Sequence, residues 1–279
     1  MDFYNSINTL QNLHTHTAYC DGQDMPEQII QTAIKKGFGS IGFSGHSYMF
    51  YSENHSMSIE GTEEYKKEIK FLKQKYKGTI GVFLGLEFDM YSEIDLCGYD
   101  YLIGSLHYLK IGREYVGFDR SAEVVAKIID DYFGGNGMAF AKEYYGQLAR
   151  LPEYGKFDII GHFDIITKNI EKVKFFDIES KEYLDYALGA LDALRGKIPF
   201  FEVNTGAIAR GYRTSPYPYK NLLKEFKAMG FGAIISSDCH NAEYLDCSFK
   251  DARDLLLEYG FKEQFILTDS GFCAVPLKG

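Results

Sequence analysis

The sequence predicts an α/β protein in which parallel strands close into a barrel, and three observations support this prediction. Short apolar runs of strand length alternate with helix-like stretches along the chain, a pattern typical of parallel strands joined by helical crossovers. Seven such runs occur in 279 residues, a number that favours a closed barrel over an open sheet. Most runs end in polar residues, and parallel α/β proteins build their functional sites at that end of the strands.

The individual elements follow from the local residue pattern. Pro26 suits the first turn of a helix, and Gly37 fits its C-terminal end. Between them, Ile29, Ile30 and Ala33 form one apolar face. The predicted strands cover residues 12–16, 40–46, 79–89, 101–107, 158–166, 199–205 and 232–240. The predicted helices cover residues 26–36, 62–77, 121–133, 137–151, 179–195, 217–229 and 249–259.

The composition is that of a globular protein, with 46% hydrophobic and 25% charged residues. Its net charge of −9 repels a phosphate backbone, so we expect no nucleic-acid partner. No apolar run approaches the ~20 residues that a membrane span needs, and the start of the chain lacks the basic and apolar regions of an export signal. Five cysteines without CxxC spacing are typical of free thiols in a reducing compartment. We therefore expect a cytoplasmic protein without a membrane partner.

Histidines gather at the ends of the predicted strands. Six of the seven lie at or near a C-terminal strand end, namely His14, His16, His46, His107, His162 and His240. The seventh, His55, lies in a polar segment, where we expect it to be solvated. A single histidine is more often a core or surface residue, whereas six at this end of the strands would face one mouth. The pattern indicates metal ligation.

The spacing within two motifs strengthens this interpretation. Residues two apart in a strand point the same way, so His14 and His16 are expected to converge. The same rule brings Asp238 and His240 together and turns Cys239 away into the core. Each pair can therefore offer two ligands to one cavity.

Three carboxylates accompany the imidazoles. Glu87 ends an apolar run in which a carboxylate is costly to bury without a cation, and Asp21 follows the first strand. With Asp238 they make nine candidate ligands, more than one metal ion uses, so a three-metal cluster is expected if Glu87 bridges two ions. Three divalent ions, three carboxylates and a bridging hydroxide would leave about +2, which suits the dianion of a phosphate monoester.

In their order, these residues resemble the PHP (polymerase and histidinol phosphatase) superfamily. The motifs are HTH at 14–16, Asp21, GH at 45–46, LGLE at 84–87, GSLH at 104–107, GH at 161–162 and DCH at 238–240. They span nearly the whole chain, so we expect a single PHP metallophosphatase domain over residues 1–279. GSLHYLK, the later GFD at 117–119 and EVNTGAIARG at 202–211 are similar to the stand-alone histidinol-phosphate phosphatases of histidine biosynthesis.

The resemblance implies a distorted seven-stranded (β/α) barrel, similar to a TIM barrel, with three divalent metal ions at the strand C-termini. The three implied ligand sets are His14, His16, Glu87 and Asp238; Glu87, His107 and His162; and Asp21, His46 and His240. Zinc, manganese and iron are all compatible with such ligands. Many relatives carry an acidic residue where this chain has Gly45, a departure that bears on the support of His46 and removes none of the nine ligands.

The implied activity is hydrolysis of a phosphate monoester, specifically of L-histidinol phosphate to L-histidinol and phosphate. We expect a hydroxide that bridges two ions to attack phosphorus, because metal binding lowers the pKa of water toward ~7. The chain has neither a GxSxG motif nor a P-loop, so no side-chain nucleophile is expected. Asp21 or His240 would supply the proton that the leaving alkoxide needs.

Candidate substrate contacts come from the loops after the strands. Arg210 and Arg213 follow the sixth strand, and guanidinium groups match phosphate oxygens, so we expect one of them, with Arg210 favoured, to bind the phosphate. Asn204 and Ser44 are expected to line the mouth.

Two further segments bear on the substrate. Phe118 and Asp119 follow the fourth strand and are candidate contacts for the imidazole and the ammonium group of histidinol. The aromatic segment 47–57 is interpreted as either a lid or a surface loop.

Other functions remain open from the sequence. A PHP phosphatase could act on another small phosphate ester or on phosphotyrosine, and the net charge disfavours a nuclease or proofreading module. An amidohydrolase also begins with HxH in a barrel, but it usually bridges its metals with a carboxylated lysine, where this chain has Glu87. A metal-binding regulatory protein without activity would have lost ligands, and none of the nine is missing. The sequence does not predict the oligomeric state.

Overall fold

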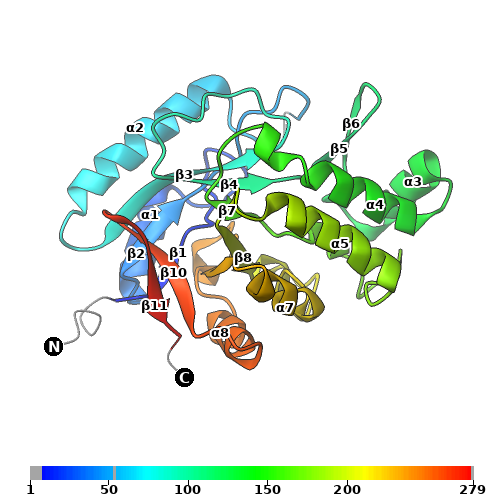
Figure 1. Ribbon diagram of the computed structural model, residues 1–279. Helices are drawn as coiled ribbons and strands as arrows, with labels where there is room; N and C mark the ends of the chain where they lie inside the picture. Colours follow the sequence, from blue (N-terminus) through cyan, green and yellow to red (C-terminus); the bar gives the residue numbers. More distant parts are fainter. Residues whose placement is uncertain (1–7, 53–54, 278–279) are drawn as a thin grey trace.

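A seven-stranded parallel sheet forms the centre of the molecule, with helices around it (Figure 1). The computed structural model describes residues 8–52 and 55–277. Neighbouring strands are parallel and follow the order β1-β2-β3-β4-β7-β8-β9. Their bounds are β1 (Gln11–Asn12), β2 (Ser40–Phe43), β3 (Gly81–Asp89), β4 (Tyr101–Ser105), β7 (Ile159–Ile160), β8 (Phe200–Asn204) and β9 (Gly232–Ser236). The predicted α/β class is confirmed.

The first and last strands meet just beyond their ends. Thr15 and Cys239 form a parallel bridge, and the His16 amide donates to the Cys239 carbonyl at 2.9 Å. The sheet therefore closes into a barrel at the end that carries the predicted ligands. The barrel prediction is confirmed.

All seven strands are shorter than predicted, and at the C-terminal ends of β1 and β7 side chains replace backbone partners. After β1, the amide of Thr15 donates to Ser44 Oγ at 3.1 Å instead of to a neighbouring strand's carbonyl. After β7, the amide of His162 donates to Glu202 Oε1 at 2.6 Å. These ends leave the regular sheet where the candidate ligands begin.

Helices cover the outside of the barrel. Their bounds are α1 (Pro26–Lys35), α2 (Ile59–Lys75), α3 (Ala122–Phe133), α4 (Gly137–Leu148), α5 (Lys181–Leu194), α6 (Gly206–Ala209), α7 (Lys220–Ala228) and α8 (Phe249–Glu258). All seven predicted helices are present, and α6 is a short addition. Helix α2 begins three residues before the predicted Thr62, because Ser58 caps it by accepting a hydrogen bond from the Gly61 amide. Within the described ranges, no helix is long and apolar enough to cross a membrane.

Tyr101 braces the inside of the barrel. Its ring lies against Gly42 and Gly85, where a Cβ on either glycine would overlap it. Its hydroxyl donates to the Leu13 carbonyl. Strand β4 is thus tied across β3 and β2 to the segment after β1, and the glycine in the LGLE motif makes room for the ring.

Two antiparallel hairpins were not predicted. Strands β5 (Tyr108–Ile111) and β6 (Glu114–Gly117) project from the C-terminal side of β4, as Figure 1 shows. Strands β10 (Glu263–Thr268) and β11 (Gly271–Pro276) lie across the start of the barrel, where the Leu267 amide donates to Gln11 Oε1 at 2.8 Å. The second hairpin closes the N-terminal end of the barrel, so the opposite end is left open for a site.

Candidate metal centre

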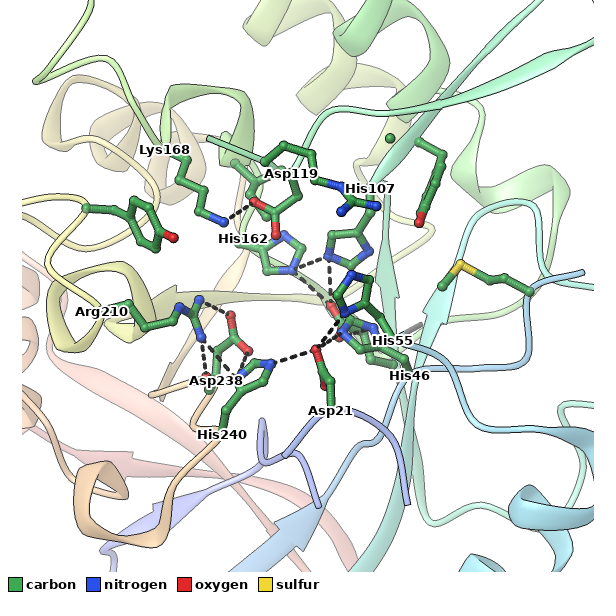
Figure 2. A pocket seen from close by; sticks show the side chains of 17 residues that line it. Asp21, His46, His55, His107, Asp119, His162, Lys168, Arg210, Asp238 and His240 are labelled. Carbon is green, nitrogen blue, oxygen red and sulfur yellow. Dashed lines mark hydrogen bonds and ion pairs between the residues drawn. The ribbon is translucent and has the colours of Figure 1, made fainter. Parts of the chain in front are cut away.

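The nine predicted ligands lie together at the C-terminal mouth of the barrel. Over the residues that the structure describes, four groups of histidine and acidic side chains place their ligand atoms within 4.8 Å of one another. The groups are His16, Asp21, His46 and His240; His14, Glu87 and His162; His14, His16 and Asp238; and His46, Glu87 and His107. Every predicted ligand belongs to a group, and each group consists of predicted ligands. Figure 2 shows several of them facing one cavity.

Glu87 lies at the centre of the cluster. Its Oε1 is 2.9 Å from His162 Nε2 and 3.5 Å from His107 Nε2. Its Oε2 is 3.2, 3.5 and 3.0 Å from ring nitrogens of His14, His16 and His46. The two oxygens of one carboxylate therefore face different histidines, as the predicted bridging role requires.

Asp21 and Asp238 extend the cluster on the other side. Asp21 Oδ2 is 3.3 Å from His240 Nε2 (Figure 2), and Asp21 Oδ1 is 3.4 Å from His16 Nδ1. Asp238 Oδ1 is 3.1 Å from His16 Nε2. Asp238 adopts a φ of 45°, an uncommon conformation for a residue with a side chain, and such strain is typical of functional sites.

Several buried atoms of the cluster lack a hydrogen-bond partner. They are His14 Nε2, His16 Nε2, His46 Nδ1, Asp21 Oδ1 and Glu87 Oε2. Buried polar atoms normally have partners, because leaving them without one costs free energy. Imidazole nitrogens and carboxylate oxygens aimed at a common space are the donor set that divalent cations use. The residues therefore fit a site for divalent metal ions.

The electrostatics of the cluster explain how so many titratable groups can be buried. Burial alone would raise the pKa of the Glu87 carboxyl, but the surrounding imidazoles, led by His14, hold it well below its usual value. Burial alone would lower the pKa of His107, but Glu87 and Asp89 raise it to about 9. Without cations the cluster therefore retains protons, and metal ions must displace them.

Two buried carboxylates orient histidines from the side of the ring that faces away from the cavity. Glu202 Oε2 accepts a hydrogen bond from His14 Nδ1 at 2.9 Å, and Asp89 Oδ2 accepts one from His107 Nδ1 at 2.9 Å. In both rings Nε2 faces the cavity, and it would present its lone pair to a metal ion once its proton is displaced. A carboxylate behind a metal-binding histidine is a recurring arrangement, because it sets the tautomer and the ring orientation. Asp89 was missed in the sequence, although it lies two residues after Glu87 in the same strand.

Two of the predicted substrate contacts line the cavity. Arg210 Nη2 is 3.0 Å from Asp238 Oδ2, and its Nη1 is 3.0 Å from His240 Nδ1. Asp119 Oδ1 accepts a hydrogen bond from Lys168 Nζ at 2.8 Å across the mouth (Figure 2).

The structure corrects the other four. Arg213 is buried between the rings of Tyr217 and Tyr219 and donates to Thr167 Oγ1 at 2.7 Å, so it stabilises the loop from behind. Ser44, Asn204 and Phe118 are also buried and do not line the cavity. Ser44 and Asn204 hold backbone and side-chain groups beneath the ligands, and Phe118 packs on Phe140 and Tyr144 in the core.

Comparisons with known proteins agree with this geometry. A family model described as the PHP domain matches residues 12–206. The chain belongs to the PHP domain family. Among curated relatives of this PHP protein, the histidinol-phosphatase of Bacillus subtilis is 27% identical over 254 residues, which cover 82% of this chain and 92% of the relative. A probable histidinol-phosphatase of Deinococcus radiodurans is 29% identical over 253 residues, which cover 86% and 89%.

A solved structure shares the whole fold. It is a histidinol phosphate phosphatase of Lactococcus lactis in complex with zinc, L-histidinol and phosphate. The TM-score is 0.71 at 22% identity, and the match covers 95% of this chain and 98% of the other. The fold is thus shared well beyond the residues matched by the PHP model.

The departure from the PHP pattern at Gly45 has a structural counterpart. A Cβ at this position would lie 3.2 Å from Cys20 Sγ and 3.4 Å from the Met57 side chain. The space that a larger residue would enter is therefore filled by sulfur atoms. His46 is oriented here without an acidic residue directly before it in the sequence, through its contact with Glu87.

The mouth also contains residues that the sequence did not assign to it. His55 lines the cavity, with Nδ1 3.6 Å from Asp21 Oδ2, and its side chain stays 43% exposed, as expected of a solvated histidine. Lys168 and Arg120 add positive charge to the rim. Within the segment 47–57, residues 53 and 54 lie outside the described residues, and Tyr51 donates to Asp89 Oδ1 at 3.1 Å. Tyr51 thus ties the segment to β3, and Met49 and His55 of the same segment line the cavity.

Proposed function

We propose that this PHP protein hydrolyses L-histidinol phosphate to L-histidinol and phosphate. The observation that carries the proposal is the convergence of all nine predicted ligands on one cavity whose rim bears Arg210, Lys168 and Arg120. Cationic side chains beside a cluster of divalent ions suit a phosphate dianion. The names of the curated relatives and the ligands of the L. lactis structure support histidinol phosphate as the ester.

We propose that three divalent ions bind in the mouth. The ligand sets are His14, His16, Glu87 and Asp238; Glu87, His107 and His162; and Asp21, His46 and His240. The spatial groups support this division for the third set and for most of the first, and they also bring His14 close to His162. Zinc, manganese and iron all suit these ligands, and the zinc in the L. lactis structure favours zinc.

Metal ions bound there would act as Lewis acids and lower the pKa of water to about 7. The chain's own residues supply the remaining functions. Arg210 binds the phosphate oxygens, since its guanidinium is held at the cavity by Asp238. Asp21 Oδ2 and His240 Nε2 lie 3.3 Å apart, and one of the two passes a proton from water to the leaving alkoxide, which leaves hydroxide behind.

The remaining lining residues suit the histidinol part of the substrate. Asp119 provides a carboxylate for its ammonium group, and Lys168, which is paired with Asp119, lies within reach of the phosphate side. Met49, Tyr108 and Ile165 offer apolar surface for the imidazole, in the role that the sequence assigned to Phe118.

The cavity measures about 240 Å³, which suits a small ester better than a phosphotyrosine on a protein surface. We further propose that residues 1–279 act as one domain in the cytoplasm, which the five free cysteines support.

Phosphate release from a panel of esters tests the proposal. The purified protein is loaded with zinc, manganese or iron and assayed with L-histidinol phosphate, other small phosphate monoesters and a phosphotyrosine peptide. We expect the highest kcat/KM for L-histidinol phosphate, together with about three bound ions. Higher kcat/KM for another ester reassigns the substrate. Bound metal without hydrolysis of any ester supports the metal-binding regulatory protein instead.

A further inference from the structure

Glu202 is the most fully hydrogen-bonded acidic side chain beneath the cluster. It is buried on β8, and its Oε2 accepts hydrogen bonds from His14 Nδ1 at 2.9 Å and Ser236 Oγ at 2.6 Å. Its Oε1 accepts hydrogen bonds from the His162 amide at 2.6 Å and Asn204 Nδ2 at 2.9 Å. Glu202 is absent from the four candidate ligand groups. Its oxygens accept hydrogen bonds from protein groups and are not directed at the cavity.

The direction of these bonds has a consequence for His14. An ionised carboxylate can only accept, so the hydrogen bond requires a proton on His14 Nδ1. The neutral ring then has its lone pair on Nε2, which lies 3.2 Å from Glu87 Oε2 and has no hydrogen-bond partner. The amide of His162 is fixed by the same carboxylate. One side chain thereby orients two of the three members of the His14, Glu87 and His162 group.

We propose that Glu202 is a positioning residue that sets the tautomer of His14 and anchors His162, and so creates the metal affinity of their shared group. The proposal rests on the metal-dependent function proposed above. It distinguishes Glu202 from Asp89, which orients the ring and amide of a single histidine, His107.

Glu202→Gln is the decisive variant, because it keeps the shape and removes one acceptor. The glutamine oxygen satisfies the His162 amide and Asn204, which are both fixed donors. The glutamine NH₂ then faces His14 Nδ1, which must accept. The proton of the neutral ring moves to Nε2, the atom that the metal needs. A wrong histidine tautomer is a known route to large functional loss with little change in geometry.

Metal affinity is measured by competition with a chromophoric chelator, using zinc and the full-length protein. We expect Glu202→Gln to weaken zinc binding at one or more subsites by about 10- to 100-fold. Glu179→Gln makes the same chemical change at an exposed site and should bind zinc as the unaltered protein does. Glu202→Gln with unaltered zinc affinity would overturn the proposal.

A second measurement needs no change at Glu202 and decides the matter even if Glu202→Gln does not fold. Histidine labelled with nitrogen-15 reports the protonated and the zinc-bound ring nitrogens in the zinc-loaded protein. The signals of His14 are assigned as those that disappear in His14→Gln. We expect the proton on Nδ1 and zinc on Nε2, whereas a proton on Nε2 contradicts the proposal. Neither measurement uses a phosphate ester, so a protein that binds zinc as expected but releases no phosphate refutes the proposed function alone.

Discussion

The two ends of the barrel are built from the same strands and differ in almost every chemical respect. At the N-terminal end, Leu13, Ile103, Ile234 and Leu267 pack with Tyr101 into an apolar cluster beneath the β10–β11 hairpin. At the C-terminal end, the same strands present imidazoles and carboxylates that lack enough partners of their own. The transition is abrupt, because Leu13 belongs to the apolar cluster and His14 to the candidate metal centre.

The difference shows how the fold tolerates a costly site. Buried polar atoms without partners destabilise a protein, whereas buried apolar side chains contribute about 1.5–3 kcal/mol each. The closed end and the outer helices can therefore offset the open end until cations bind. Substitutions at the open end should accordingly lower turnover, and substitutions at the closed end should lower the free energy of unfolding.

The largest effect is expected for Asp21→Asn at the open end. The change removes a negative charge and one acceptor from the third proposed ligand set, while the shape of the side chain is kept. We expect kcat for L-histidinol phosphate to fall by about 10²- to 10⁴-fold with an unchanged circular dichroism spectrum. Full activity in this variant would remove Asp21 from the site.

The next prediction compares two arginines that are three residues apart. Arg210→Ala removes a cation from the cavity and should lower kcat/KM by about 10²-fold, since charge stabilisation by one group is typically of this size. Arg213→Ala leaves the buried Asp164, 3.9 Å from Arg213 Nη1, without its cation and should reduce the free energy of unfolding by about 3–5 kcal/mol.

Steady-state kinetics and urea denaturation of both variants test whether Arg210 contributes to catalysis and Arg213 to stability. A large loss of stability in Arg210→Ala, or a stable Arg213→Ala with impaired kcat/KM, would contradict it.

The contrast between these arginines also shows which features could be predicted from the sequence. The nine cluster residues were predictable because their position at strand ends determines where they face, and because their motifs recur in order. Arg210 and Arg213 lie in one loop, where the path of the backbone decides which side chain enters the cavity. Sequence spacing carries no information about that path.

Sequence spacing also carries no information about how the side chains of Ser44, Asn204 and His55 are placed. Ser44 and Asn204 lie at the expected strand ends, but their short side chains bond to neighbouring groups of the protein beneath the cavity. His55 reaches the mouth from the connection between β2 and α2, and Tyr51 of the same connection packs on Tyr108 and Tyr115 of the β5–β6 hairpin. Tertiary contacts of this kind have no local pattern.

A smaller effect on function is expected at the closed end. Leu267→Ala removes a buried side chain from the apolar cluster and should lower the free energy of unfolding by about 2–5 kcal/mol. The site lies at the opposite end of the strands, so kcat at a temperature well below the unfolding transition should stay within twofold of the unaltered protein. A large fall in kcat in the folded variant would show that the two ends are coupled.

The smallest effect is expected at Cys239, which lies between two proposed ligands in the sequence but turns into the core. Burial raises the pKa of its thiol to about 12, and the thiolate is the reactive form of cysteine. The raised pKa keeps the thiol protonated at pH 8, so iodoacetamide should leave Cys239 unmodified in the folded protein and label the exposed Cys97. Mass spectrometry of tryptic peptides measures both sites. Rapid labelling of Cys239 would mean that the segment between Asp238 and His240 opens to solvent, and a rigid boundary between the polar mouth and the apolar core would then be untenable.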